Sequence, residues 1–149
     1  MEILPKKFNI YTDGSAKATG LRAGSFCSVV VSDTGIRKLR CGTSVPSSIG
    51  KMEIMGVCAG LETVLEIMDG NKWGYSVHIY CDSEYVVNCA TGRYKRTKNQ
   101  NEWAIFDRFA SGLNISIEHT NRNTLPDQAI CDDVSGKIRA AVEGLIDFE

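Results

Sequence analysis

Four acidic residues stand where a strand is expected to end or a helix to begin. Asp13 and Asp82 each follow a short apolar stretch, while Glu53 and Asp132 stand near the starts of two helical patterns. Carboxylates held close together repel one another unless a divalent cation neutralises them, and a dense set of oxygen ligands suits Mg²⁺ or Mn²⁺. Two such ions about 4 Å apart activate an attacking water and stabilise the leaving oxygen of a phosphodiester. If the fold gathers these four side chains, they predict metal-dependent phosphodiester hydrolysis.

Each of these acids has an ordinary structural explanation when it is taken alone. An aspartate at the end of a strand is most often a turn former or a helix cap. A glutamate near the start of a helix is favoured by the helix dipole without any function. The functional interpretation therefore depends on the four acids together and on the local sequences around them.

Two glycines share a helix face with one of the acids. Glu53, Gly56 and Gly60 fall on one side of the helix expected over residues 51–68. Each glycine costs roughly 1 kcal/mol relative to alanine inside a helix. Close approach of another backbone beside Glu53 would offset that cost, and sequence drift is the alternative explanation.

The hydrophobic pattern predicts five strands and four helices around these acids. Period-two alternation and short apolar runs mark strands over residues 8–13, 25–31, 36–43, 76–81 and 115–119. A 3.6-residue period and glycine stop signals mark helices over residues 51–68, 82–92, 102–111 and 127–148. Ser47 or Ser48 is available to cap the first helix, and the helical period that begins at Lys51 places Glu53 in the first turn. The order predicts a mixed sheet with helices on its faces, in which neighbouring first and fourth strands would bring Asp13 and Asp82 to one edge.

Length and composition favour one compact domain over residues 1–149. The chain is 43% hydrophobic, which excludes wholesale disorder, and no apolar run reaches the roughly 18 to 20 residues of a membrane helix. The start lacks a signal-peptide stretch, so the expected location is the cytoplasm, or the cytoplasm of a virus-infected cell. The net charge of −1 means that a nucleic-acid site must be a local basic patch. The six cysteines have no CxxC spacing and are expected to be reduced and mostly buried.

The local sequences around the four acids carry a family resemblance. They read Ile10-Tyr11-Thr12-Asp13-Gly14-Ser15, Lys51-Met52-Glu53-Ile54-Met55, Tyr80-Cys81-Asp82-Ser83-Glu84-Tyr85-Val86 and Cys131-Asp132. This set resembles type 1 ribonuclease H, which carries its active-site acids in TDGS, RMELMA, TDSQYV and RCDELA segments in the same order and at similar spacing. The resemblance spans roughly residues 8–142. It implies an α/β (α+β) ribonuclease H-like fold: a five-stranded mixed sheet, three antiparallel strands then two parallel, with helices on both faces.

The resemblance also implies an activity. It is that of a hydrolase, an endonuclease that cuts the RNA strand of RNA/DNA hybrids by a two-metal-ion mechanism. The two Mg²⁺ ions, or Mn²⁺ in their place, would be held by four carboxylates: Asp13, Glu53, Asp82 and Asp132. Asp133 is a less favoured alternative to Asp132. A histidine after the fifth strand assists proton transfer or product release in the family, and His119 is its counterpart here; a solvated loop histidine is the alternative.

The residues expected to bind the hybrid depart from the family pattern. The loop before the long helix usually carries asparagines, and here it reads Ser48-Ile49-Gly50, so Ser15 and Ser48 are expected to serve instead. Glu84 stands where the family often has glutamine, and Gln128 stands where it has an asparagine near the metal site. A short basic segment is expected to contact phosphates through Arg93, Lys95, Arg96 and Lys98. An ordinary charged surface loop is the alternative for this segment.

Two other classes of protein share parts of this pattern. A nucleic-acid-binding module that kept the fold and is catalytically weak or inactive is the main alternative, and the presence of all four acids argues against it. Sugar kinases and actin-type ATPases also use an Asp-Gly turn near phosphate, but 149 residues are too few for their two lobes. The expected partner is an RNA/DNA hybrid and not a membrane. The protein is expected to be a monomer that acts alone or in association with a polymerase.

Overall fold

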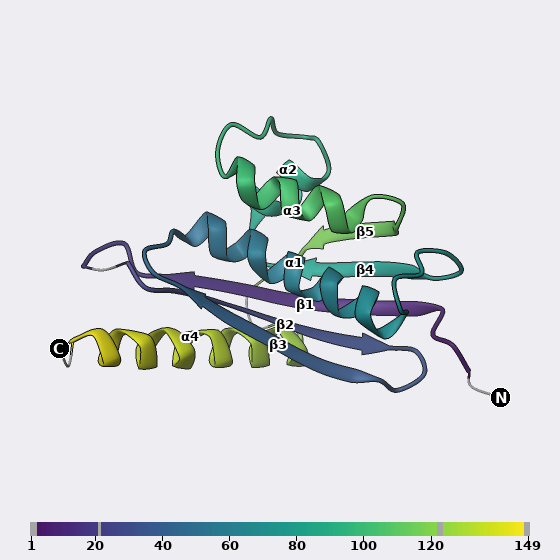
Figure 1. The fold of residues 1–149 in the computed structure, drawn as a ribbon, viewed down its shortest axis with the longest axis horizontal. Coiled ribbons are helices and arrows are strands. Elements are labelled where there is room, and N and C mark those ends of the chain that lie inside the picture. The colour runs from purple at the N-terminus through teal and green to yellow at the C-terminus, as the bar shows by residue number, and fades with distance from the viewer. Residues whose placement is uncertain (1–2, 21, 122–123, 148–149) are drawn as a thin grey trace.

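The computed structural model describes residues 3–20, 22–121 and 124–147, and its centre is a five-stranded sheet. The strands are β1 (Lys7–Ala16), β2 (Gly24–Ser32), β3 (Arg37–Ser44), β4 (Ser76–Cys81) and β5 (Asn114–His119). They lie in the order β3-β2-β1-β4-β5, with β1, β2 and β3 antiparallel and β4 and β5 parallel to β1 (Figure 1). This confirms the expected mixed sheet and the expected neighbours β1 and β4.

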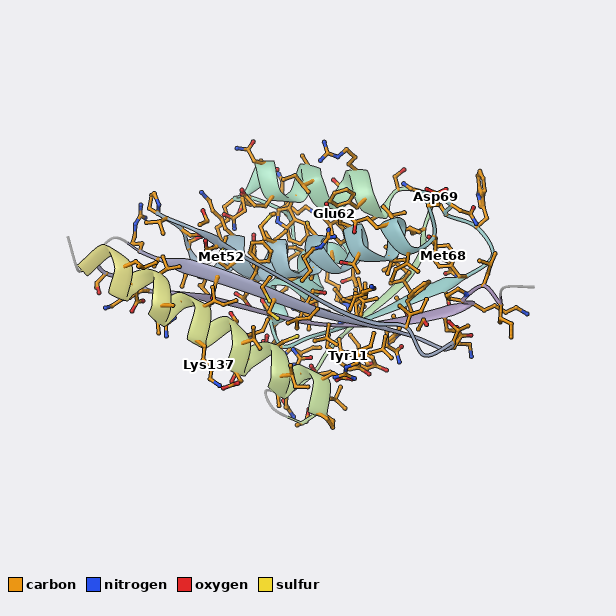
Figure 2. The ribbon with its side chains drawn as sticks, turned by 60° about the horizontal axis from the view of Figure 1, so that its bottom comes forward. Tyr11, Met52, Glu62, Met68, Asp69 and Lys137 are labelled. Atoms are coloured by element: carbon orange, nitrogen blue, oxygen red, sulfur yellow. The ribbon has the colours of Figure 1, made fainter. Side chains whose placement is uncertain are left out.

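Four helices in the described part of the chain cover the two faces of the sheet. They are α1 (Ile49–Ile67), α2 (Glu84–Ala90), α3 (Gln100–Ala110) and α4 (Pro126–Asp147). α1 packs across β1 and β2 on one face, with α2 and α3 beside it, and α4 crosses β1 and β2 on the other face (Figures 1 and 2). Within the described residues, no helix combines the length and apolar character needed to cross a membrane.

The alternation of side chains along β1 explains why both faces of the sheet are covered. Phe8 and Ile10 point into the main core, which also contains Trp103 of α3 at 1% exposure. Tyr11 points to the other face and packs against a smaller cluster that includes Cys27 and Cys131. Because a strand places successive side chains on opposite faces, a strand that is apolar on both sides needs a helix on each.

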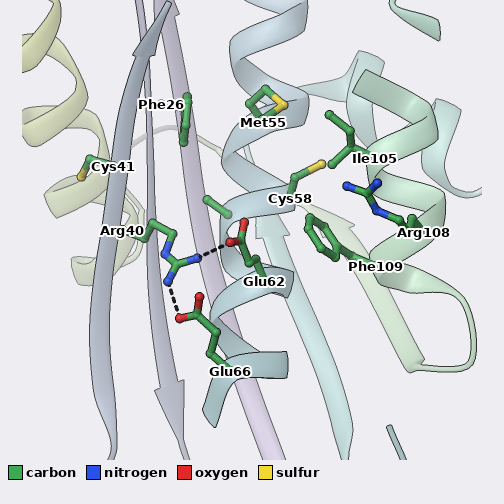
Figure 3. Close-up of a pocket in the computed structure, with 11 residues that line it drawn as sticks. Phe26, Arg40, Cys41, Met55, Cys58, Glu62, Glu66, Ile105, Arg108 and Phe109 are labelled. Carbon is green, nitrogen blue, oxygen red and sulfur yellow. Dashed lines mark hydrogen bonds and ion pairs between the residues drawn. The ribbon is translucent and has the colours of Figure 1, made fainter. Parts of the chain in front are cut away.

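The β2–β3 hairpin is tied to α1 by two ion pairs of one arginine. Arg40 of β3 pairs with Glu62 at 3.0 Å and also with Glu66, both on α1. These side chains border a pocket of about 550 Å³ between the hairpin, α1 and α3 (Figure 3). The contact fixes the hairpin relative to the helix that carries Glu53.

Most expected boundaries differ from the structure by one or two residues, and two of the differences bear on the acids. β1 runs past Asp13 to Ala16, because β2 continues to pair with it as far as Gly24; only the pairing with β4 stops beside Asp13. α1 begins at Ile49, where the Ser48 hydroxyl accepts a hydrogen bond from the Lys51 N–H at 3.4 Å. Glu53 is therefore in the second turn, and its expected place in the first turn was wrong because the helix begins two residues before Lys51, directly after the expected cap Ser48. The expected end of the last helix at residue 148 lies outside the described residues.

Candidate active site

Asp13 and Asp82 stand at neighbouring positions, just past the last residues at which β1 and β4 pair. The parallel pairing of β1 with β4 ends at Thr12 and Cys81, the residues that directly precede the two acids. Asp13 is only 4% exposed and Asp82 is half-buried. Because the carboxyl ends of parallel strands meet at one edge of a sheet, the two acids start from the same edge.

Glu53 is brought to this edge by a backbone contact between α1 and β1. A Cβ atom on Gly14 would lie 2.8 Å from the Glu53 Cα and against the Glu53 nitrogen. A Cβ atom on Gly56 would lie 3.0 Å from the Asp13 carbonyl oxygen. The predicted close approach of a backbone beside Glu53 is thus confirmed, and it explains why the helix tolerates glycine there.

The helix that carries Asp132 is fixed to the same part of β1. The Cys131 thiol donates to the Tyr11 carbonyl at 3.1 Å, and the Gln128 side-chain amide donates to the Thr12 carbonyl. Asp132 is half-buried, whereas Asp133 is exposed and pairs with Lys137 at 2.9 Å. These surroundings favour Asp132 over Asp133 as the fourth acid.

The pKa of the Cys81 thiol reflects the negative charge at this edge of the sheet. Burial is the largest cause that raises its pKa to about 12, and the charges of Asp82 and Glu53 add to the effect. Both carboxylates therefore act on one buried group at the end of β4.

His119 stands beside Asp82 at the end of β5. It pairs in register with Cys81, its ring is exposed, and its Nε2 donates to the Asp82 carbonyl at 3.1 Å. A carbonyl accepts only from a protonated nitrogen, so the neutral ring carries its proton on Nε2 and keeps Nδ1 as an acceptor.

Four residues expected to bind substrate have different surroundings. Ser15 is half-buried on β1, and Glu84 is exposed at the start of α2. Ser48 uses its hydroxyl to cap α1. Gln128 is 1% exposed and bonds to protein groups on both sides, because its Oε1 also accepts from the Thr120 hydroxyl at 3.4 Å. Gln128 therefore lies beneath the site rather than on its surface.

The basic segment between α2 and α3 presents three of its four cations to solvent. Arg93, Lys95 and Lys98 are exposed. Arg96 instead folds back onto α3, where one guanidinium nitrogen bonds to both carboxylate oxygens of Asp107 at 2.8 Å and its carbon lies 4.4 Å from the centre of the Trp103 ring. The segment is thus a small basic patch anchored by Arg96.

Two polar residues near the site were not identified from the sequence. Asn99 has a left-handed backbone (φ 61°), donates to the Tyr85 hydroxyl at 3.0 Å and lies against Gly50. It brings an asparagine beside Gly50, in the segment where this sequence lacks the asparagines of the family pattern. The N–H of Thr120 donates to the Cys81 carbonyl at 2.8 Å. The tolerance of asparagine for positive φ is a weak signal for the first, and no local signal marks the second.

The donor chemistry of the four acids fits a hard divalent cation, since all of their side-chain donors are carboxylate oxygens. Among the described residues, no group of three or more His, Cys, Asp and Glu side chains is gathered so as to hold a metal ion. The backbone contacts around Asp13 bring the four elements together, and the four carboxylates as a set of metal ligands stay a prediction.

Comparison with known proteins identifies the family. The model of the RNase H family matches residues 5–126. No curated protein matches the chain. Among solved structures, LC11-RNase H1 from compost, in complex with an RNA/DNA hybrid, is similar with a TM-score of 0.77, 19% identity, and coverage of 91% of this chain and 98% of that one.

Two further structures show the range of the similarity. The N-terminal RNase H domain of Rv2228c from Mycobacterium tuberculosis has a TM-score of 0.78 at 18% identity, over 95% of this chain and 99% of that one. The prototype foamy virus protease-reverse transcriptase has a TM-score of 0.67 at 18% identity, over 87% of this chain and 20% of that one. Since the family model matches most of the sequence, this chain belongs to the RNase H family and is a hydrolase of the ribonuclease H type.

Proposed function

We propose that this protein is a metal-dependent endoribonuclease that hydrolyses the RNA strand of RNA/DNA hybrids. The main support is the set of contacts with the backbone of β1 around Asp13, through which α1, β4 and α4 all meet the same part of this strand. The similarity to LC11-RNase H1, which was solved with an RNA/DNA hybrid, supports the hybrid as substrate.

In this proposal four carboxylates hold two Mg²⁺ ions, or Mn²⁺ in their place: Asp13, Glu53, Asp82 and Asp132. When bound, such ions lower the pKa of an attacking water and stabilise the charge on the departing 3′ oxygen. The contribution of the chain is to hold four acidic groups near one point, which costs free energy in the absence of cations because like charges repel. The close packing of α1 on β1 supplies the rigidity that opposes this repulsion.

His119 is assigned to proton transfer or product release. Its exposed ring stands next to Asp82, and the bond from Nε2 to the Asp82 carbonyl leaves Nδ1 able to accept a proton. This is the state that a general base needs near neutral pH.

The hybrid is proposed to lie over the acids and across the exposed basic patch. Arg93, Lys95 and Lys98 would contact phosphates, so affinity for the hybrid would fall as salt rises. Ser15, Ser48 and Glu84 remain proposed substrate contacts. The similarity to a protease-reverse transcriptase supports association with a polymerase as one setting for this activity.

The experiment is a cleavage assay on three substrates. Labelled RNA/DNA hybrid, duplex RNA and duplex DNA are incubated with the protein and Mg²⁺, Mn²⁺ or EDTA. We expect metal-dependent cutting of the RNA strand of the hybrid alone. Binding of the hybrid without cutting in any metal would support the binding-module alternative and contradict this proposal.

The first prediction concerns Asp13. Asp13→Asn keeps the size of the side chain but removes a charge, and we expect cleavage to fall by roughly three orders of magnitude, because metal-ion stabilisation of the transition state amounts to several kcal/mol. Asp133→Asn is the matched control on the exposed neighbour of Asp132 and should keep the parent rate. An Asp13→Asn variant that cuts as fast as the parent refutes the assignment.

A further inference from the structure

The carbonyl groups directly before Asp13 and Asp82 are each held by a residue outside the strand. The Thr12 carbonyl accepts from the Gln128 side-chain amide of α4. The Cys81 carbonyl accepts from the Thr120 backbone N–H, just after β5, at 2.8 Å. The pairing of β1 with β4 ends at these two residues, and buried carbonyls at the end of a ladder need other donors.

The two residues that supply these donors also bond to each other. The Thr120 hydroxyl donates to the Gln128 Oε1 at 3.4 Å. Gln128 is 1% exposed, so both ends of its side chain are committed to protein groups and neither reaches the surface. A chain of hydrogen bonds therefore runs from Thr12 in β1, through Gln128 and Thr120, to Cys81 at the end of β4.

The same chain of bonds reaches the two other groups of the proposed mechanism. Gln128 precedes Asp132 by four residues in α4, so the two residues lie on one face of that helix, one turn apart. Thr120 directly follows His119. The Nε2 of His119 donates to the carbonyl of Asp82, the residue after Cys81. Displacement of either bonding residue would therefore shift acids from three separate segments.

We propose that Gln128 and Thr120 form a positioning pair that sets the distances between Asp13, Asp82 and Asp132 and does not contact substrate. This inference rests on the proposed function and replaces the substrate contact expected of Gln128 from the sequence. A positioning pair acts on the spacing of the acids, so its loss lowers kcat and metal affinity while the binding of the hybrid, measured by KM, stays the same.

The test uses substitutions that keep side-chain volume. Gln128→Met keeps the length of the side chain and removes both hydrogen-bonding ends, and we expect kcat on the RNA/DNA hybrid to fall roughly ten- to a hundredfold with KM within about twofold. Thr120→Val is isosteric and should lower kcat by a smaller factor, whereas Thr120→Ser retains the hydroxyl and should restore the parent value. Ser135→Ala is the control for stability alone, because Ser135 is the other buried polar anchor of α4 and bonds to Ser25 on β2 at 3.0 Å.

A second readout needs no nucleic acid. Calorimetric titration of the parent with Mn²⁺ gives its affinity for the cation, which we expect Gln128→Met to weaken roughly tenfold or more and Ser135→Ala to leave unchanged. If the parent binds Mn²⁺ but cuts no hybrid, the proposed function fails. The Mn²⁺ affinity of Gln128→Met relative to the parent then tests the positioning pair by itself.

Three results would overturn the inference. If the pair positions the acids, Gln128→Met loses both kcat and Mn²⁺ affinity, so parent-like values of both quantities refute the inference. A rise in KM with unchanged kcat would return Gln128 to a substrate-binding role. A parent that neither binds Mn²⁺ nor cuts the hybrid would remove the site that the pair is proposed to position, and with it both proposals.

Discussion

Side chains of the same chemical type have different surroundings in this structure even when they are close in sequence. Asp132 is half-buried one turn from Gln128, whereas Asp133 is exposed and paired with Lys137. Arg96 is bound to Asp107 across the basic segment, whereas Lys95 is exposed. At the scale of the residue, the type of a side chain does not show whether its role is structural or chemical. Its burial and its bonding partners do.

His119 provides a test at this scale. His119→Ala should slow turnover by roughly ten- to a few-hundredfold, within the range of general acid–base groups, and should change stability little because the ring is exposed. Single-turnover cleavage of the hybrid measures the rate. His78→Ala is the matched control, since His78 pairs with Ser116 and Glu118 elsewhere on β4 and β5. An unchanged rate in His119→Ala would identify a solvated loop histidine.

At the scale of the element, glycine has opposite effects in two places. Gly14 lets the backbone of α1 touch β1, since a Cβ atom there would lie 2.5 Å from the Met52 carbonyl carbon. Gly136 in α4 has no atom within 4 Å of the position that a Cβ would take. The first glycine is required by packing, and the second only weakens its helix.

The same substitution at these two sites should therefore have opposite signs. Gly14→Ala should lower the free energy of unfolding by about 1–3 kcal/mol, as overpacking does, and reduce cleavage because Glu53 is pushed from Asp13. Gly136→Ala should raise the free energy of unfolding by up to about 1 kcal/mol, because alanine has the higher helix propensity, and should leave cleavage unchanged. Urea denaturation and the hybrid assay measure both effects. Equal stability changes of one sign would contradict the close contact of α1 with β1.

At the scale of the whole molecule, the core contains buried thiols. All six cysteines are free, five of them are buried and Cys41 is half-buried, which confirms the expectation of reduced, mostly buried cysteines. Burial, followed by the charges of Glu102 and Glu62, raises the pKa of Cys58 from 9.0 to about 12. The folded protein therefore keeps a proton that the unfolded chain loses near pH 9.

This difference predicts a loss of stability in alkali. The contribution of the Cys58 thiol is complete below the unfolded pKa of 9.0 and is lost as pH rises toward about 12, with a slope of about 1.4 kcal/mol per pH unit for such a group. Cys58→Ala should show a shallower fall of unfolding free energy than the parent between these pH values. The measurement is urea denaturation at several pH values, and parallel curves for the two proteins would contradict the prediction.

Local sequence patterns predicted much of this fold. β4 has the bounds expected from the alternation of Val77, Ile79 and Cys81, and the order of strands and helices agrees throughout. Of the boundaries that failed, the end of β1 depends on a distant partner, because pairing with β2 extends it to Ala16. The start of α1 depends instead on its adjacent cap, Ser48. Periodicity is a property of a segment, whereas the end of a strand depends on its neighbours.

The sequence by itself determined the family, the order of the elements and the identity of four acids with their local contexts, because motifs and periodicity are short-range features. Only the tertiary structure decided that Gly14 and Gly56 bring α1 against β1, that Arg96 is bound to Asp107, and that Gln128 lies buried between β1 and Thr120. These contacts join residues distant in the chain, and the free energy of packing, which selects among them, acts only when the elements come together.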